Sequence, residues 1–531
     1  MTRLVSASFV INYPLTSRHY KSETMSSDND SLAVRRIVIV GGGTAGWMTA
    51  AYLAKFTQLV GCEITLIESP DQPTIGVGEA SIPSLVRFVR NLGFDEVEMM
   101  KYCHATYKLG IRFEDWTGKG NSFWHPFGVC GSRINHADLF HFWYRENFNG
   151  NDVIDHYSQY SLQVKLCEQN KAPRSFRDQS PLMESGGYAY HLDSHRFAEY
   201  LKAKAIPMGV LHYLENVNAV ERGSDGQLIS IRTETNNIIS GDLFIDCTGF
   251  ESLLIERELE SGFEHWDDEL LCDRAIVCRS DAMEPLPPYT ISRSLSAGWA
   301  WRIPLSTNTG FGYVYSSKHL RDAEAKEELA TQFDLNADLL TKPPIKMQIG
   351  CRPQSWVHNC VAIGLSSGFT EPLESSGIHM IQLAIETLLD RFPDKTMNSS
   401  LQDSFNARIY QSFMAIKDFL SIHYLFSTTE DGAFWEDARN VAMSPRLNAI
   451  LESYREHGWV DIAGDEVFGE ASFHHLLNGC SVLPRRPHLL SEMVSKDEII
   501  TILEQIRGRN SEITSKMPEQ SMLIDFFQNS P

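Results

Sequence analysis

Residues 34–40, Val-Arg-Arg-Ile-Val-Ile-Val, lead directly into residues 41–46, Gly-Gly-Gly-Thr-Ala-Gly. The first run is β-branched and apolar, which is typical of a buried parallel strand. Residues 47–55 then have the composition of a helix, and residues 63–68, Glu-Ile-Thr-Leu-Ile-Glu, form a second expected strand that ends in an acid. This βαβ context makes the G-x-G-x-x-G pattern a strong dinucleotide fingerprint.

The fingerprint predicts where a dinucleotide would bind. Its three glycines allow a tight turn, a close approach of the backbone to a pyrophosphate, and close packing of the helix. The start of the helix would offer N–H groups to the phosphates. The acid at the end of the second strand stands where a carboxylate would hold the ribose hydroxyls of FAD or NAD. The residues expected at this cofactor site are Gly41, Gly43, Thr44, Ala45, Gly46 and Glu68.

Composition and charge are those of an ordinary globular protein. At 531 residues, the chain is long enough for two domains or for one elaborated domain. Its hydrophobic share is 43% and its charged share is 22%. The formal charge of −21 argues against nucleic acid and anionic membranes as partners, because binding either needs clustered cations. The charge is compatible with an enzyme that acts on a small neutral or cationic molecule.

Targeting signals and metal motifs are not apparent in the sequence. No apolar run approaches the roughly 18 residues that span a bilayer, and the start of the chain lacks the basic and apolar segments of a secretory signal. The ten cysteines are scattered, without C-x-x-C pairs or metal-ligand spacing. We therefore expect a cytoplasmic protein with reduced thiols and no metal site.

The chain divides into three segments by composition. Residues 1–33 are polar and predict a flexible N-terminal extension. Residues 242–249 and 360–364 are two further buried strands, so pieces of the dinucleotide module are spread over residues 34–394, with substrate-side elements inserted between them. Residues 395–531 predict a mainly helical C-terminal region.

Residues 299–304, Trp-Ala-Trp-Arg-Ile-Pro, are the second informative stretch. Alone, they would indicate a half-buried strand with both indoles on one face. Together with the glycine motif, they resemble the G-x-G-x-x-G and W-x-W-x-I-P signature of the flavin-dependent halogenases of the tryptophan halogenase family, over about residues 35–440. The resemblance implies an α/β fold, in which a Rossmann-like FAD-binding module of the flavin monooxygenase type carries a largely helical substrate-side region.

The resemblance also implies the catalytic residues. Alone, Lys108 would be taken for a solvated surface lysine, but residues 104–113 have the shape of the family segment that holds the catalytic lysine. Residues 369–378, Phe-Thr-Glu-Pro-Leu-Glu-Ser-Ser-Gly-Ile, match the segment with the essential glutamate, here Glu374, and with the halide site, here Ser376 and Gly377. Backbone N–H groups at a helix start suit an anion, although a plain helix entry would have the same pattern.

Substrate and further cofactor contacts follow from the same resemblance. Residues 123–128 resemble the aromatic loop that sandwiches the substrate ring, with His125 and Phe127 at the contacting positions; a satisfied core histidine is the alternative. Trp299 and Trp301 would form a wall between flavin and substrate. The further FAD contacts implied by the resemblance are Glu79, Ala80, Val217, Leu365 and Ile378.

The family chemistry assigns a role to each group. Reduced FAD and O₂ oxidise chloride or bromide to hypohalous acid, which Lys108 would hold by a hydrogen bond or as a haloamine. Glu374 would orient the oxidant or accept the proton of the ring intermediate. Since the chain has one dinucleotide fingerprint, the resemblance implies a separate NAD(P)H-dependent flavin reductase, while a homodimer stays open.

Residues 468–480 depart from the family pattern. They do not match the Trp/Asn/Tyr-rich lid of the tryptophan-specific members, which favours a more open pocket for indoles or a larger aromatic molecule. An aromatic hydroxylase on the same fold and a non-catalytic flavin-binding protein are the alternative functions.

Overall fold

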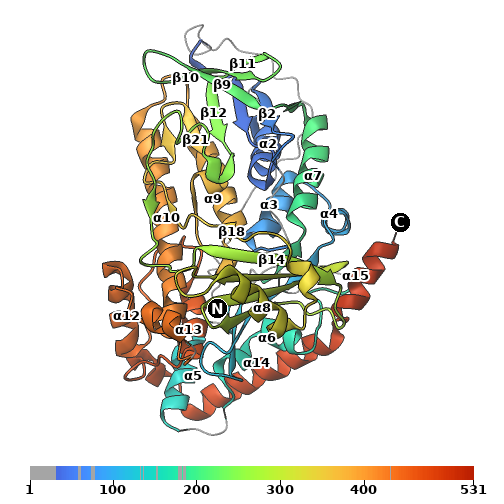
Figure 1. Cartoon of the computed structure of the whole chain (residues 1–531). Helices are drawn as coiled ribbons and strands as arrows, with labels where there is room; N and C mark the ends of the chain where they lie inside the picture. The colour runs from blue at the N-terminus through green and yellow to red at the C-terminus, as the bar shows by residue number, and fades with distance from the viewer. Residues whose placement is uncertain are drawn as a thin grey trace, which may run out of the picture.

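The computed structural model describes residues 31–530, except residues 58–60, 73–77, 132, 135–136, 151–153, 178–181, 183–186 and 431. The predicted N-terminal extension lies almost entirely outside the described residues. In Figure 1, a dinucleotide-type sheet with its helices occupies one end of the molecule, a second sheet lies across the middle, and C-terminal helices cover the other end. None of the described helices has the length and apolar character needed to cross a membrane.

The first sheet is built from the strands predicted around the glycine motif. Its order is β20 (Trp356–Val357), β21 (Cys360–Ala362), β12 (Leu243–Asp246), β1 (Arg36–Val40), β2 (Glu63–Glu68) and β8 (Leu211–Leu214). The pairs from β21 to β8 are parallel, and only β20 runs antiparallel to its neighbour. α2 (Thr44–Thr57) packs against α7 (Ser194–Ala205) and α9 (Gly377–Asp390). These strands are buried and β-branched, as parallel strands covered by helices must be.

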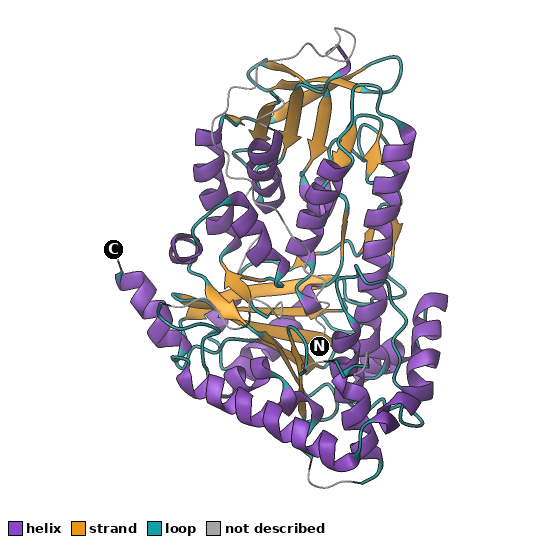
Figure 2. Cartoon of the chain, turned by 180° about the vertical axis from the view of Figure 1, so that it is seen from behind, coloured by secondary structure: helices purple, strands orange, loops and turns teal. Residues whose placement is uncertain are grey.

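The second sheet has seven strands and was not predicted from the sequence. Its order is β18 (Ile345–Lys346), β14 (Arg274–Asp281), β17 (Asn308–Tyr315), β16 (Gly298–Pro304), β15 (Thr290–Leu295), β5 (Gly110–Glu114) and β6 (Ser122–Pro126). β15 and β5 are parallel, and the other pairs are antiparallel. Figure 2 shows this sheet between the dinucleotide-type sheet and the C-terminal helices. The substrate side is therefore built from strands as well as helices.

The tryptophan motif lies on β16 of this second sheet. Trp299 and Trp301 are 2% and 8% exposed, so both indoles are buried, not half-buried as the motif alone would indicate. Their ring centroids are 5.8 Å apart, which places both rings on one face of the sheet. Gly312 of β17 pairs with Trp301, and a Cβ there would lie 2.0 Å from the indole ring. Only glycine leaves room for the Trp301 ring.

The C-terminal helices complete the fold and share its largest apolar core. They are α10 (Ser399–Leu425), α11 (Gly432–Arg439), α12 (Pro445–His457), α13 (Glu470–Gly479), α14 (Lys496–Lys516) and α15 (Gln520–Asn529). Trp47 of α2, Trp299 of β16 and Phe419 of α10 belong to one cluster of buried side chains. α13 packs against β6 and α10, and this brings the C-terminal region to the centre of the molecule.

The remaining elements connect these layers. A three-stranded sheet has the order β3-β7-β4 and lies beside the first sheet's helices. The other bounds are β3 (Glu79–Ala80), α3 (Ser84–Leu92), α4 (Glu96–Tyr102), β4 (Thr106–Lys108), α5 (Leu139–Phe148), α6 (Leu162–Glu168), β7 (Ala189–Leu192), β9 (Val217–Arg222), β10 (Leu228–Thr233), β11 (Ile238–Ser240), β13 (Glu264–His265), α8 (Asp322–Phe333), β19 (Gly350–Cys351) and β22 (Gly368–Phe369).

Replacing Gly312 tests the packing of the tryptophan motif. We expect Gly312→Ala to lower the free energy of unfolding by about 1–3 kcal/mol, because the added methyl would overlap the Trp301 ring in a filled core. Urea unfolding followed by circular dichroism measures the change. Gly464→Ala is the control, because a Cβ there meets no described atom within 4 Å. Equal stability of the two variants would contradict this packing argument.

Candidate active site

Lys108 ends strand β4 and is completely buried, so the surface reading of this lysine is wrong. Its Nζ donates hydrogen bonds to the Ser375 hydroxyl at 2.7 Å and to the Ser81 carbonyl at 3.2 Å. The same nitrogen lies 5.1 Å from the centre of the Phe127 ring. Ser375 is 267 residues away along the chain and adjoins Glu374. The fold thus brings the predicted lysine to the predicted glutamate segment.

Glu374 lies at the end of the 3₁₀ turn Pro372–Glu374 and is 2% exposed. One carboxylate oxygen is 2.8 Å from His125 Nδ1, and the other is 2.8 Å from His423 Nε2. The second ring nitrogen of His423 lies 3.2 Å from the Phe419 carbonyl within α10. Two imidazoles from different elements therefore fix the orientation of this carboxylate.

Burial and neighbouring charges set the protonation of this pair. Burial lowers the pKa of Lys108 to about 7, although the nearby Glu374 carboxylate opposes the shift. Burial also works against ionisation of Glu374, but contact with His125 and His423 holds the pKa of this carboxyl down to about 2. At neutral pH, the site therefore contains a carboxylate and an amine that is accessible in its neutral form.

A helix begins directly after Glu374. Ser375 has a left-handed backbone, with φ of 60°, and Ser376 is the N-cap of α9, which starts at Gly377. A Cβ on Gly377 would meet no described atom within 4 Å, so the space beside the first turn is open. A helix start carries partial positive charge and free N–H groups. The predicted anion site, Ser376 and Gly377, therefore lies at a helix start with open space beside it, next to the Ser375 contact of Lys108.

A second acid of the same segment was missed from the sequence. Glu371 is completely buried and accepts hydrogen bonds from Trp299 Nε1, at 2.9 Å, and from the Tyr424 hydroxyl. Burial raises the pKa of Glu371 to about 7, although these two donors oppose the shift. Glu371 thus fixes the orientation of the Trp299 indole. Its place three residues before Glu374 was a usable signal, whereas His423 and Tyr424 stand in a helix without any motif.

The glycine loop has the shape of a phosphate site. Gly41 has φ of +110°, and a Cβ there would lie 2.2 Å from the Cys247 carbonyl oxygen. A Cβ on Gly46 would lie 1.8 Å from the Gly41 oxygen, whereas one on Gly43 meets no described atom within 4 Å. Two glycines are thus required by the fold, and the third faces open space at the start of α2, where the residues fit a pyrophosphate.

Glu68 stands beside this loop at the end of β2. Its carboxylate is 2.8 Å from His212 Nε2 and 3.2 Å from Lys202 Nζ. Burial opposes ionisation of Glu68, but these two partners lower the pKa of the carboxyl overall. A Cβ on Gly42 would overlap the Glu68 side chain at 2.3 Å. A charged carboxylate therefore lies within reach of a ribose bound along the loop.

The other predicted flavin contacts surround the same end of the sheet. The turn that holds Leu365 touches the loop, because a Cβ on Gly364 would lie 2.8 Å from Ala45 Cβ. Ile378 lies in the first turn of α9, which packs against α2. Val217 begins β9, just after the Glu215 amide that donates to the Glu68 carbonyl at 2.9 Å. Glu79 and Ala80 form β3, on the opposite side of β7 from the strand of Lys108.

A cavity of about 1330 Å³ reaches the direct neighbours of Glu374 and Lys108, although neither of these two residues is among the described residues that line it. His125 and Phe127 line it, as do Phe468 and Gly469 from the segment before α13. His125 is thus both a buried partner of Glu374 and part of the cavity wall, so the two sequence readings of this histidine are compatible. Trp299 and Trp301 are not among the described residues that line this cavity; both belong to the buried core.

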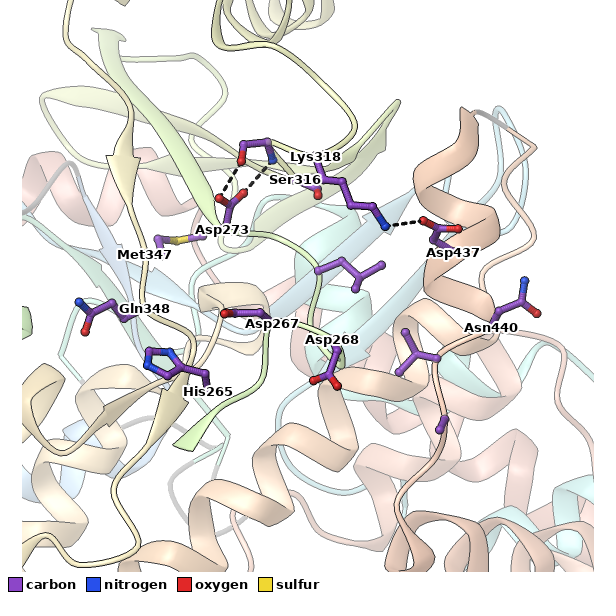
Figure 3. Close-up of a pocket in the computed structure, with 14 residues that line it drawn as sticks. His265, Asp267, Asp268, Asp273, Ser316, Lys318, Met347, Gln348, Asp437 and Asn440 are labelled. Atoms are coloured by element: carbon purple, nitrogen blue, oxygen red, sulfur yellow. Dashed lines mark hydrogen bonds and ion pairs between the residues drawn. The ribbon is translucent and has the colours of Figure 1, made fainter. Parts of the chain in front are cut away.

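A separate pocket of about 800 Å³ is acidic and contains none of the predicted site residues. Figure 3 shows Asp267 and Asp268 on its floor, with Lys318 pointing to Asp437, 3.2 Å away. Asp273 accepts hydrogen bonds from the backbone and hydroxyl of Ser317. Because none of the predicted site residues lines this pocket, the cavity lined by His125 and Phe127 remains the candidate active site.

Comparison with known proteins agrees with this geometry. The family model described as tryptophan halogenase matches residues 36–496. The chain is 37% identical to tryptophan 7-halogenase RebH of Lentzea aerocolonigenes, over 80% of this chain and 82% of the relative. Its structure is similar to Xcc4156, a flavin-dependent halogenase from Xanthomonas campestris, with a TM-score of 0.87, 34% identity, and coverage of 94% and 99% of the two chains.

One further solved structure and one further relative show a similar level of likeness to this chain. BrvH, a flavin-dependent halogenase from Brevundimonas sp. BAL3, gives a TM-score of 0.86 with 34% identity, over 93% of this chain and 99% of that chain. Tryptophan 6-halogenase ThaL of Streptomyces albogriseolus is 34% identical over 86% of this chain and 91% of the relative.

The pKa of Lys108 predicts a pH-dependent stability difference. The folded-state pKa is about 7, whereas an unfolded lysine has a pKa of about 10.4. Between these values the unfolded chain binds a proton that the folded chain does not, so the wild-type unfolding free energy rises with pH relative to Lys108→Met, by up to about 1.4 kcal/mol per pH unit. Urea unfolding at pH 7 to 10 measures this slope. Lys55→Met, which replaces an exposed lysine, is the control, and its unfolding free energy should change with pH as that of wild type does. If the unfolding free energies of wild type and Lys108→Met also change with pH in parallel, the lowered pKa of Lys108 is refuted.

The glycine loop yields a second prediction with a matched pair. Gly43→Ala should fold with unchanged stability but lose at least tenfold in FAD affinity, because its methyl would enter the open space where a pyrophosphate fits. Gly46→Ala should instead lose stability, since its methyl meets the Gly41 oxygen. Flavin fluorescence titration and thermal unfolding separate the two effects. Wild-type FAD affinity in Gly43→Ala would show that the dinucleotide lies elsewhere.

Proposed function

Because the chain belongs to the tryptophan halogenase family, we propose that it is a flavin-dependent halogenase acting on an electron-rich carbon of an indole-like aromatic molecule. The observation that carries this proposal is the buried Lys108 amine, bonded to Ser375 beside a carboxylate that two histidines hold. A plain flavin-binding fold has no need of this amine. A buried lysine without a fixed counter-ion contact costs stability, which is tolerable where the amine performs chemistry.

The dinucleotide site fits FAD by its own geometry. Gly41, Gly43 and Gly46 shape the loop, and Glu68 offers a carboxylate to the ribose. Thr44 and Ala45 lie at the start of α2, whose N–H groups would face the phosphates. When bound in reduced form, FAD supplies with O₂ the oxidising power that converts halide to hypohalous acid. A separate NAD(P)H-dependent reductase would provide the reduced flavin.

The start of α9 would bind chloride or bromide. Ser376 and Gly377 offer backbone N–H groups at the positive helix end, and the open space beside Gly377 accommodates the ion. Because Ser375 joins this turn to Lys108 Nζ at 2.7 Å, an oxidant formed near the helix start has a short path to the amine. Lys108 would hold it by a hydrogen bond or as a haloamine, and a pKa of about 7 makes both protonation states available.

Glu374 would serve mainly through its charge. A carboxyl whose pKa is held at about 2 is a weak base, so it suits stabilisation of positive charge on the lysine and on the ring intermediate. His125 and His423 keep both oxygens in place, so this stabilisation needs no rearrangement during reaction. Proton removal from the ring is a second role for the same group.

The cavity supports an open aromatic pocket. Its volume of about 1330 Å³ exceeds the roughly 300–1,000 Å³ that is usual for small-molecule pockets. His125 and Phe127 would contact the substrate ring, while the buried Trp299 and Trp301 would form a steric wall between flavin and substrate. The size favours indole derivatives or larger aromatic molecules over free tryptophan.

The ten cysteines are unpaired, which fits a reducing, cytoplasmic compartment.

The test is product analysis with a flavin reductase, NADH, O₂ and each halide in turn. With a panel of indoles, we expect mass spectrometry to detect a halogenated product, and Lys108→Ala to reduce its formation at least 100-fold while flavin oxidation continues. Lys55→Ala, at an exposed helix end, should retain activity. Hydroxylated product formed without halide would identify an aromatic hydroxylase, and the absence of any product would favour a non-catalytic flavin protein.

A further inference from the structure

Four polar side chains converge where helix α13 meets helix α5. Glu470 and His474 are four residues apart and share one face of α13. His141 lies in the first turn of α5, and Asp138 is the N-cap of that helix. His141, Glu470 and His474 each direct one nitrogen or oxygen to a common point, and these three atoms lie within 4.8 Å of one another. Both histidines are at most 2% exposed.

Hydrogen bonds in the described part of the chain leave the converging atoms unsatisfied. His474 Nε2 is 3.0 Å from the Gly458 carbonyl and must donate to it, so a neutral ring carries its lone pair on Nδ1. Glu470 uses its other oxygen for Arg133, at 2.6 Å, which leaves Oε1 available. Among the described residues, neither His474 Nδ1 nor Glu470 Oε1 has a hydrogen-bond partner. Buried acceptors normally have a partner, and a cation bound between these atoms would supply one.

The spacing of the atoms suits a metal ion. Glu470 Oε1 lies 3.7 Å from His141 Nε2, and His474 Nδ1 lies 3.6 Å from Asp138 Oδ1. The first distance joins two of the three converging atoms; it is beyond hydrogen-bond range but near the roughly 3.4 Å that separates two ligands of a tetrahedral Zn²⁺ with bonds of about 2.1 Å. A ligand histidine normally donates its second ring N–H to a carbonyl or carboxylate, as His474 does to Gly458.

We propose that His141, Glu470 and His474 bind a divalent first-row transition metal ion, Zn²⁺ in the first place, with the Asp138 carboxylate beside His474. Imidazole nitrogens and carboxylate oxygens are the ligands that these ions favour. Asp138 is held in place by the Phe140 amide at 2.9 Å and the Tyr157 hydroxyl at 3.2 Å. No metal site was expected from the sequence, because the ligands come from two helices separated by more than 300 residues.

The ion would connect the two helices at the edge of the large cavity. Asp138 and Glu470 line this cavity together with Phe468, which stacks on Phe419 at 4.0 Å between ring centroids. A metal bridge between α5 and α13 therefore fixes the start of α13 and the wall in front of it. This inference does not depend on halogenase activity, because the ion takes no part in the proposed reaction.

Metal analysis of the full-length chain, produced without a histidine tag, tests the proposal. After incubation with Zn²⁺, Co²⁺, Mn²⁺ or Ni²⁺ in turn and desalting, we expect elemental analysis to find about one Zn²⁺ or Co²⁺ per chain. His474→Gln and Glu470→Gln should each retain less than a tenth of this. His475→Gln is the matched control, since it removes a buried imidazole from the same helix outside the cluster and should retain the ion.

Two measurements guard against variants that fail to fold. The wild-type chain loaded with Co²⁺ should show the visible absorption of a four-coordinate cobalt ion, and Zn²⁺ should raise the melting temperature of wild type and His475→Gln only. Wild-type protein that retains none of the four metals would overturn the proposal. Equal metal retention by folded His474→Gln and His475→Gln would overturn it too.

Discussion

The site depends on burying an amine that can be protonated, Lys108, together with an ionised carboxylate, Glu374. Lys108 is completely buried, and without nearby partners its ammonium form would cost several kcal/mol. The structure limits this cost by hydrogen bonds to Ser375 and Ser81 and by the nearby Glu374 carboxylate, whose own charge is held by His125 and His423. Of these partners, the Glu374 carboxylate is the one whose charge keeps the pKa of Lys108 from falling further.

The architecture follows from the need to assemble these groups from distant segments. The three-stranded sheet presents Lys108 on β4, and the dinucleotide module presents the turn before α9, which also carries Ser375. The seven-stranded sheet delivers His125 on β6, and the long helix α10 delivers His423. Four separate parts of the fold thus meet at Glu374 and Ser375, so the C-terminal helices contribute to the candidate active site as much as the cofactor module does.

Local patterns in the sequence predicted the cofactor module, because the strands β1, β2, β12 and β21 are apolar and the glycine motif specifies its own turn. They did not predict the seven-stranded sheet, whose parallel pair joins β5 to β15 across about 180 residues. Lys108 and Glu374 came from family resemblance, since nothing in their own neighbourhoods marks them as buried. Neither local patterns nor family resemblance predicted His423, because the role of a single histidine in a long helix depends on which residues it contacts in the folded chain.

The burial of the two tryptophans on β16 has a consequence for the durability of the protein. Trp299 and Trp301 are indoles, chemically of the same class as the proposed substrate, and they stand close to where the oxidant would be made. Their burial and the Glu371 hydrogen bond that locks the Trp299 ring shield them from attack. This burial would protect the enzyme from its own product whenever oxidant forms before a substrate has arrived.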